Sequence, residues 1–136
     1  LGYSANGLLT SIADSLNRKM TLSYNSAGRV ARIDGENGKV ATFNYNAENE
    51  LTYSKDVDGN EYWFSYSNDR RHNLTEVRYA DKTTLQVAYY PKDLNENVKS
   101  IRDRDGTLTE YSYKYSSGDK NNFTVSLRVK TKEGQD

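Results

Sequence analysis

Few residues in this sequence are suited to catalysis or metal binding. Cysteine is absent and histidine occurs once, which excludes a thiol nucleophile, a disulfide framework and a multi-histidine metal site. The single histidine, His72, follows Asp69, Arg70 and Arg71, but no motif supplies the nucleophile or orienting carboxylate that a general base needs. We therefore predict a solvated loop here. The alternative is contact between Arg70, Arg71 and His72 and an anionic partner.

The segment DVDGNE (56–61) begins like a calcium loop. Asp56, Asp58 and Asn60 offer oxygen ligands at the required spacing. The distal glutamate and the flanking helices of such a loop are missing, so a hairpin turn is the favoured interpretation, as it is for DRDGT (103–107). No pair of carboxylates stands out for glycoside hydrolysis. We expect no catalytic residue, no metal and no cofactor.

Aromatic residues concentrate between positions 45 and 66. Most of them are expected to belong to a shared hydrophobic face, and Trp63 is the exception because it lies among polar positions. Stacked aromatic rings on a sheet can bind sugar rings or another protein chain. Tyr53, Tyr62 and Trp63 are therefore the candidates for binding a glycan or protein ligand.

The elements that must position these residues follow from a tyrosine repeat. Tyr3, Tyr24, Tyr45 and Tyr66 are separated by three intervals of 21 residues, and the series continues more widely spaced. A segment with alternating apolar residues precedes each later tyrosine, as expected for a half-buried antiparallel strand. An apolar residue stands 15 positions before five of the tyrosines. These pairs are Leu9/Tyr24, Val30/Tyr45, Leu51/Tyr66, Leu74/Tyr89 and Val98/Tyr113.

Turn signals lie midway between the members of each pair. Asn37-Gly38, Asp58-Gly59 and Asp105-Gly106 are typical of type I′ turns, in which both central residues have positive φ. Each unit is thus predicted to be a β-hairpin. A turn centred there would place Val30 opposite Tyr45, and Leu51 opposite Tyr66.

A second set of apolar residues does not fit simple alternation. Ile12, Ile33, Val77 and Ile101 follow the first apolar residue of their units by three positions, which places them on the opposite face. Either a bulge resets the alternation, or both faces are partly covered. We favour partial cover near the turns.

These patterns predict an all-β fold. We expect an antiparallel meander of about ten to twelve strands, forming a curved open sheet or a partial barrel. A single domain spans 1–136, with repeats at about 7–27, 28–48, 49–71, 72–95 and 96–120 and partial repeats at both ends. Exposed sheet edges favour edge-to-edge self-association.

Composition excludes several partners. Nineteen basic and nineteen acidic residues give a formal net charge of zero, which argues against nucleic acid and anionic membranes. No apolar run is long enough to span a bilayer.

The repeated unit resembles the YD repeat, also called the RHS repeat. Three copies carry the likeness best: GLLTSIADSLNRKMTLSYN (7–25), GRVARIDGENGKVATFNYN (28–46) and NELTYSKDVDGNEYWFSYS (49–67). The chain departs from the family where an aspartate should follow the tyrosine. Those positions hold Ser4, Asn25, Asn46, Ser67, Tyr90 and Lys114.

The resemblance implies a sheet of successive hairpins that forms part of a shell. Such shells occur in secreted bacterial toxins and in cell-surface proteins, and they enclose or display another segment of the same polypeptide. It implies a non-enzymatic structural segment of a secreted or surface protein, cut from a longer array. The alternative is a small surface module that recognises glycan or protein through aromatic and loop residues.

Overall fold

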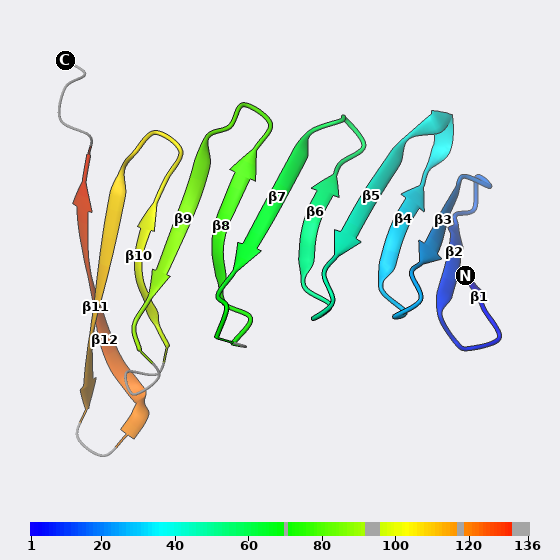
Figure 1. Ribbon diagram of the computed structural model, residues 1–136. Coiled ribbons are helices and arrows are strands. Elements are labelled where there is room, and N and C mark those ends of the chain that lie inside the picture. Colours follow the sequence, from blue (N-terminus) through cyan, green and yellow to red (C-terminus); the bar gives the residue numbers. More distant parts are fainter. Residues whose placement is uncertain (70, 92–95, 117–118, 132–136) are drawn as a thin grey trace. The chain divides into compact units, whose positions relative to one another are not determined.

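The computed structural model describes residues 1–69, 71–91, 96–116 and 119–131, and it is built almost wholly from strands. Twelve strands follow one another in chain order (Figure 1), and the successive pairs from β1/β2 to β6/β7 and from β8/β9 to β11/β12 are antiparallel. The strands are β1 (Gly2–Tyr3), β2 (Leu9–Ala13), β3 (Lys19–Tyr24), β4 (Val30–Asp34), β5 (Val40–Tyr45), β6 (Leu51–Lys55), β7 (Glu61–Tyr66), β8 (Leu74–Tyr79), β9 (Thr84–Tyr89), β10 (Val98–Arg102), β11 (Leu108–Ser116) and β12 (Asp119–Lys130). Within the described residues the strand order starts at β1 and ends at β12 without a crossover, which confirms the predicted all-β meander.

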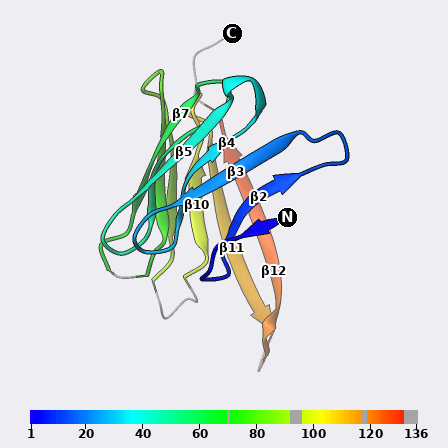
Figure 2. The ribbon, with the colours of Figure 1, turned by 90° about the vertical axis from the view of Figure 1, so that its right-hand side faces the viewer.

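The chain divides into two compact units, and each is a meander in itself. The first comprises Leu1–Ser65 with Tyr79–Asp81, and the second comprises Tyr66–Arg78 with Lys82–Asp136. In the first unit, β2 to β5 lie side by side in both views (Figures 1 and 2). The single domain over 1–136 and its repeat boundaries stay predictions.

Six of the loops between strands share one backbone geometry. In the loop 56–60, the Asp56 amide donates to the Asn60 carbonyl (3.0 Å) and the Gly59 amide donates to the Asp56 carbonyl (3.1 Å), while Gly59 has φ 90°. This is a type I turn followed by a left-handed residue. The same bond pattern closes the loops 4–8, 14–18, 25–29, 46–50 and 103–107. Loops inside hairpins and loops between hairpins are therefore built alike.

The type I′ prediction is correct at one of its three sites. Asn37 and Gly38 have φ 58° and 72°, and the Lys39 amide donates to the Glu36 carbonyl over 3.1 Å. At Asp58-Gly59 and Asp105-Gly106 only the glycine has positive φ, so type I′ is wrong there. A three-residue loop with one left-handed position suits the strand twist equally well and needs only one glycine.

A repeated irregularity in pairing decides which residues share a face. Tyr24 lies opposite Val30, whereas Ser23 lies opposite Arg32, so Ala31 is an extra residue of the bulge type. The same shift follows the pairs Tyr3/Leu9, Tyr45/Leu51 and Tyr89/Val98.

Because the bulge resets the alternation, Ile33 returns to the face that Val30 occupies. Ile33 lies opposite Leu22 on β3 and opposite Ala41 on β5. Ile12 lies opposite Met20, and Ile101 opposite Val87. The prediction that both faces are partly covered is therefore wrong. Within each unit, the residues of these pairs share one face, here called the apolar face, and the other is called the polar face.

The turn shifts the predicted hairpin register, because the Gly35 amide donates to the Lys39 carbonyl and leaves three residues in the loop rather than two. Ile33 opposite Ala41 and Asp34 opposite Val40 place β4 and β5 one residue away from the predicted pairing of Val30 with Tyr45. Tyr45 lies opposite Leu51 instead.

No described side chain is fully buried. Apolar side chains are half-buried by their neighbours in the sheet, and Ile12 and Met20 of the apolar face remain 40% and 43% exposed. Protein domains ordinarily bury such a face against a second layer. Among the described residues no second layer covers the apolar face.

Candidate functional site

The repeating tyrosines form one recurring contact. In four of these tyrosines, the phenol hydroxyl donates to the backbone carbonyl of the apolar residue 15 positions earlier in the chain. Burial raises the pKa of Tyr89 and Tyr113, as expected for phenols set against neighbouring strands. The bonds are Tyr24 to Leu9 (2.6 Å), Tyr45 to Val30 (2.9 Å), Tyr89 to Leu74 (2.9 Å) and Tyr113 to Val98 (3.0 Å).

Each such tyrosine connects three strands. Tyr24 on β3 pairs with Val30 on β4 through its main-chain position, while its hydroxyl reaches the start of β2. The hydrogen bond thereby joins the tyrosine to the apolar residue 15 positions earlier. The tyrosines are therefore structural, and their spacing is set by the length of one hairpin.

The residue that follows the tyrosine caps the next loop. Asn25 Oδ1 accepts from the Ala27 amide (3.0 Å) and from the Arg29 amide (2.9 Å). Asn46 Oδ1 accepts from the Glu50 amide, and Ser4 Oγ accepts from the Leu8 amide. A side-chain oxygen is what this position needs, and asparagine or serine provides it without a negative charge.

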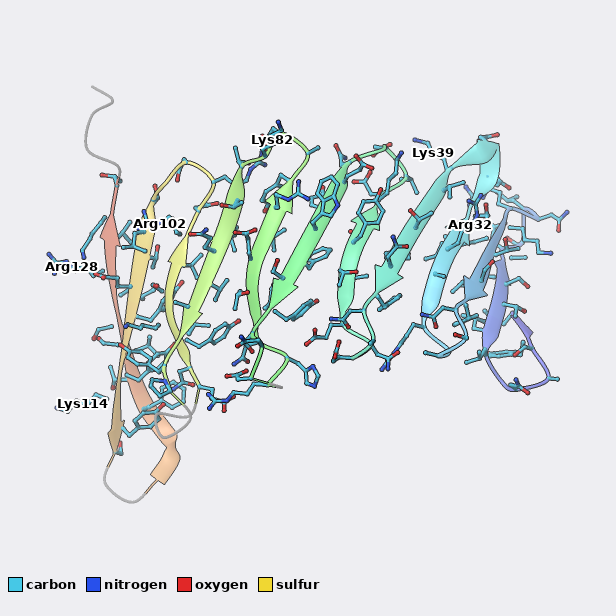
Figure 3. The ribbon with its side chains drawn as sticks, in the orientation of Figure 1. Arg32, Lys39, Lys82, Arg102, Lys114 and Arg128 are labelled. Atoms are coloured by element: carbon cyan, nitrogen blue, oxygen red, sulfur yellow. The ribbon has the colours of Figure 1, made fainter. Side chains whose placement is uncertain are left out.

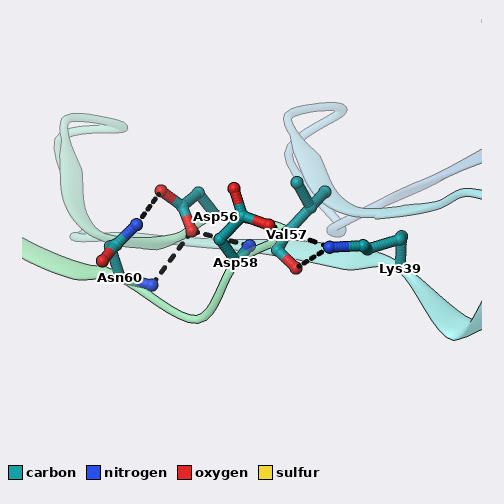
Figure 4. Close-up of polar contacts among 5 residues, drawn as sticks. All are labelled: Lys39, Asp56, Val57, Asp58 and Asn60. Atoms are coloured by element: carbon teal, nitrogen blue, oxygen red, sulfur yellow. Dashed lines mark hydrogen bonds and ion pairs between the residues drawn. The ribbon is translucent and has the colours of Figure 1, made fainter.

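The acidic loop 56–60 forms a hairpin turn held by its own donors (Figure 4). Asp56 Oδ1 accepts from the Asp58 and Asn60 amides at 2.9 Å, and Asp56 Oδ2 accepts from Asn60 Nδ2 at 2.8 Å. The Asn60 side-chain hydrogen bond is the main cause that lowers the pKa of Asp56.

A cation from the preceding hairpin completes that loop. Lys39 Nζ lies 2.8 Å from Asp58 Oδ1 and also donates to the Val57 carbonyl at 3.4 Å. The hydrogen bond from Lys39 to Asp58 raises the pKa of Lys39. Since both carboxylates are engaged by protein donors, the turn interpretation is confirmed. No group of three or more His, Asp or Glu within the described residues is placed to hold a metal ion.

The basic loop contains an ion-pair network. Arg71 Nε lies 3.1 Å from Asp69 Oδ2 and 3.3 Å from Glu96 Oε1. The Ser67 hydroxyl donates to Asp69 over 2.6 Å, which lowers the pKa of the Asp69 carboxyl. Arg70 lies outside the described residues. An anionic partner at Arg71 would have to compete with two carboxylates.

His72 has a backbone role that the sequence did not reveal. Its φ is 59°, and it occupies the left-handed position of a loop closed by the Ser67 amide and the Asn73 carbonyl. Asn17, Asn49, Lys82 and Glu96 also have positive φ. Of these five residues, only the two asparagines are of a type that favours the left-handed backbone and so signals a turn in the sequence.

The structure divides the aromatic candidates between the two faces. Tyr53 lies opposite Trp63, with ring centroids 5.5 Å apart at 56°, and the Tyr53 hydroxyl donates to Glu61 Oε1 over 2.6 Å. That hydrogen bond is the main cause that raises the pKa of Tyr53. Tyr62 lies opposite Ser54, on the other face, with its ring 5.7 Å from that of Tyr79.

Sequence reasoning missed a shallow cavity on the second unit. A hollow of about 300 Å³ lies over β10, β11 and β12, and its lining includes the charged residues Lys99, Glu110 and Arg128. Figure 3 shows Arg128 and Lys114 directed away from their strands. The sequence gives little indication of this cavity, because only the pairing register of the strands brings its lining residues together.

Comparison with known proteins agrees with the repeat. Residues 3–40 match the RHS Repeat family, which confirms the resemblance seen in the sequence. No curated protein matches the sequence. In the described residues, no helix is long and apolar enough to cross a membrane.

Solved structures share the fold at low identity. A crystal structure of TcdB2-TccC3-Cdc42 matches over 93% of this chain with a TM-score of 0.64 and 16% identity. A Tc holotoxin pore of Photorhabdus luminescens with a mutated TccC3 matches over 96% with a TM-score of 0.63 and 16% identity. This chain covers 8% of each of those chains, and the likeness concerns the fold alone.

Proposed function

We propose that this chain, whose residues 3–40 carry an RHS repeat, is a non-enzymatic structural segment of an RHS-type shell. The shell belongs to a secreted or cell-surface bacterial protein. In it, the apolar face of the sheet covers another segment of the same polypeptide, and neighbouring repeats continue the sheet at its edges.

One observation carries the proposal. The apolar residues of neighbouring strands lie opposite one another on the apolar face, as in the pairs Ile12/Met20 and Ile33/Leu22, yet no described side chain is buried. A face of this kind gains about 25 cal/mol for each Å² of apolar area that a covering segment removes from water. An apolar face that stays in contact with water is energetically unfavourable. An enclosed segment of the polypeptide would cover this face and remove it from water.

The catalytic alternative has less support. The acidic loop residues bind their own backbone and Lys39, and Arg71 is engaged by two carboxylates. These contacts are those of turns and of loop ion pairs.

The test is photo-crosslinking from each face in the native polypeptide. A photoreactive amino acid at Phe43 lies on the apolar face, because Phe43 is opposite Ser54, and one at Asn44 lies on the polar face beside Tyr53. We expect crosslinks from position 43 to a segment of the same polypeptide, and few from position 44. Equal crosslinking from both positions, or none from position 43, would refute an enclosed segment.

A second function rests on the Tyr53–Trp63 pair. These two rings lie together on the polar face, outside the apolar rows, and Glu61 accepts from Tyr53 beside them. A ring pair with an adjacent acceptor suits a sugar or a protein side chain. Glycan-array binding that is lost in Trp63→Ala and retained in Tyr62→Ala would support this module, because Tyr62 lies on the opposite face.

A further inference from the structure

The polar face of β10, β11 and β12 carries an ordered set of polar side chains. Ser100 lies opposite Glu110, and Glu110 lies opposite Arg128. Two residues further along, Ser112 lies opposite Ser126. Directly paired residues share a face, and so do alternate residues of one strand. These five side chains therefore form two adjoining rows.

The rows surround a hollow. A cavity of about 300 Å³ is lined by these five residues together with Lys99, Tyr90, Tyr111 and Leu127. The serine side chains are short, so they leave space between the longer Glu110 and Arg128. The Tyr90 hydroxyl donates to the Tyr111 carbonyl over 3.0 Å, which fixes the phenol at the cavity. The volume is at the lower end of the range of small-molecule sites, which is about 300–1,000 Å³.

The charge of the cavity is positive. Lys130 Nζ lies 2.7 Å from Glu110 Oε2, so the one carboxylate at the site is already paired. The hydrogen bond from Lys130 is the main cause that lowers the pKa of Glu110, and the charges of Arg128 and Lys99 act in the same direction. Within the described residues, neither Arg128 nor Lys99 has an acidic partner closer than 4.0 Å. Two cations thus face the solvent over a neutralised acid.

The hydroxyl groups narrow the class of ligand. Three serine hydroxyls present donors and acceptors around the hollow, and such groups match the ring hydroxyls of a sugar. An arginine side chain binds a carboxylate through two parallel hydrogen bonds. A ligand with both features carries a carboxylate on a polyhydroxylated ring.

We propose that the cavity over β10–β12 binds an acidic saccharide. Arg128 and Lys99 hold the carboxylate of a uronic-acid residue, and Ser100, Ser112 and Ser126 hydrogen-bond its hydroxyl groups. The site lies within one unit and does not depend on whether the chain forms part of a shell.

The test is a titration of the whole chain with a disaccharide that contains glucuronic acid. Binding is monitored through the backbone amide chemical shifts, at 50 mM and at 150 mM salt. We expect saturable shifts at residues 99–100, 110–112 and 126–128, and weaker binding at the higher salt. Arg128→Gln should weaken binding about tenfold, because a charge-assisted hydrogen bond contributes roughly that much. Lys99→Gln should also weaken it.

Lys114→Gln is the matched control. Lys114 lies on the same face of β11, loses the same charge, and does not line the cavity, so this variant should bind like the wild type. The proposal is overturned if Lys114→Gln weakens binding as much as Arg128→Gln, if a neutral glucose disaccharide binds equally well, if inorganic phosphate binds as tightly as the uronate, or if no saturable shifts occur.

Discussion

The tyrosine hydroxyls are predicted to stabilise the sheet through single hydrogen bonds to backbone carbonyls. Tyr45→Phe removes only the oxygen atom that lies 2.9 Å from the Val30 carbonyl and leaves the ring in place. A neutral hydrogen bond contributes about 0.5–1.5 kcal/mol to stability. We therefore expect Tyr45→Phe to lower the free energy of unfolding by about 1 kcal/mol.

The chain offers a matched control for this substitution. Tyr3 stands at the same repeat position, opposite Leu9, but it is 60% exposed and its hydroxyl makes no hydrogen bond within the described residues. Tyr3→Phe should change the free energy of unfolding by less than about 0.5 kcal/mol, as surface substitutions usually do.

The assay is urea denaturation monitored by far-UV circular dichroism. The dependence of the unfolding free energy on urea concentration, the slope, is compared between variants. A lower midpoint at constant slope reports lost stability rather than a changed unfolded state. Replacing Tyr24, Tyr45, Tyr89 and Tyr113 together should cost about 2–6 kcal/mol, if the four bonds act independently. The reasoning is refuted if Tyr45→Phe and Tyr3→Phe have the same midpoint, or if the fourfold variant is as stable as the wild type.

Three further predictions follow from the loops and charges. Lys82→Gly should raise the free energy of unfolding by about 1 kcal/mol, because Lys82 has φ 68°, and Gly59→Ala should lower it by a similar amount because φ is 90° there and no atom lies closer than 4.0 Å to the new Cβ. Thermal unfolding of both variants checks the signs, and a loss of stability in Lys82→Gly would contradict them. Asn25→Ala should cost about 0.5–1.5 kcal/mol through loss of the side-chain acceptor for two exposed amides, whereas Asn25→Asp should be nearly neutral; equal losses in a urea titration would refute the capping role. The folded-state pKa values of Asp34, Asp56 and Glu110 are lowered, so their contribution to stability is complete above the unfolded values and disappears as the pH falls through the folded ones; urea midpoints should drop below about pH 4, less steeply in Glu110→Gln, and a midpoint independent of pH would count against it.

The repeat made the strands predictable because each tyrosine and its apolar partner mark the ends of one hairpin. Tyr24 and Leu9 stand 15 residues apart and are joined by a hydrogen bond, so spacing in the sequence reports a contact in space. The turn positions were equally visible, since glycine and asparagine favour the left-handed backbone at Gly59 and Asn49.

The bulge was not predictable from periodicity alone. Ala31 is an ordinary residue whose insertion into the pairing moves Ile33 to the face of Val30, and nothing in its side chain signals this. Ile33 was assigned to the wrong face because the strict alternation of side chains along a strand was assumed to continue through the bulge. The candidate pair Tyr53 and Trp63 was recognised, but grouping Tyr62 with them ignored that adjacent residues of a strand face opposite ways.

The cavity over β10–β12 was invisible for a related reason. Ser100, Glu110 and Arg128 are far apart in sequence, and only the register of two successive pairings places them in one row. Their types are common on any solvated strand, so composition gives no signal.

Side-chain contacts of Ile33, measured by nuclear Overhauser effects in a methyl-labelled sample, test most directly whether a bulge gathers the apolar residues onto one face. The register predicts contacts from the Ile33 methyl groups to Leu22 and to Ala41. Methyl contacts from Ile33 to the side chains of Ser23 and Thr42 instead would place it on the opposite face and contradict the account.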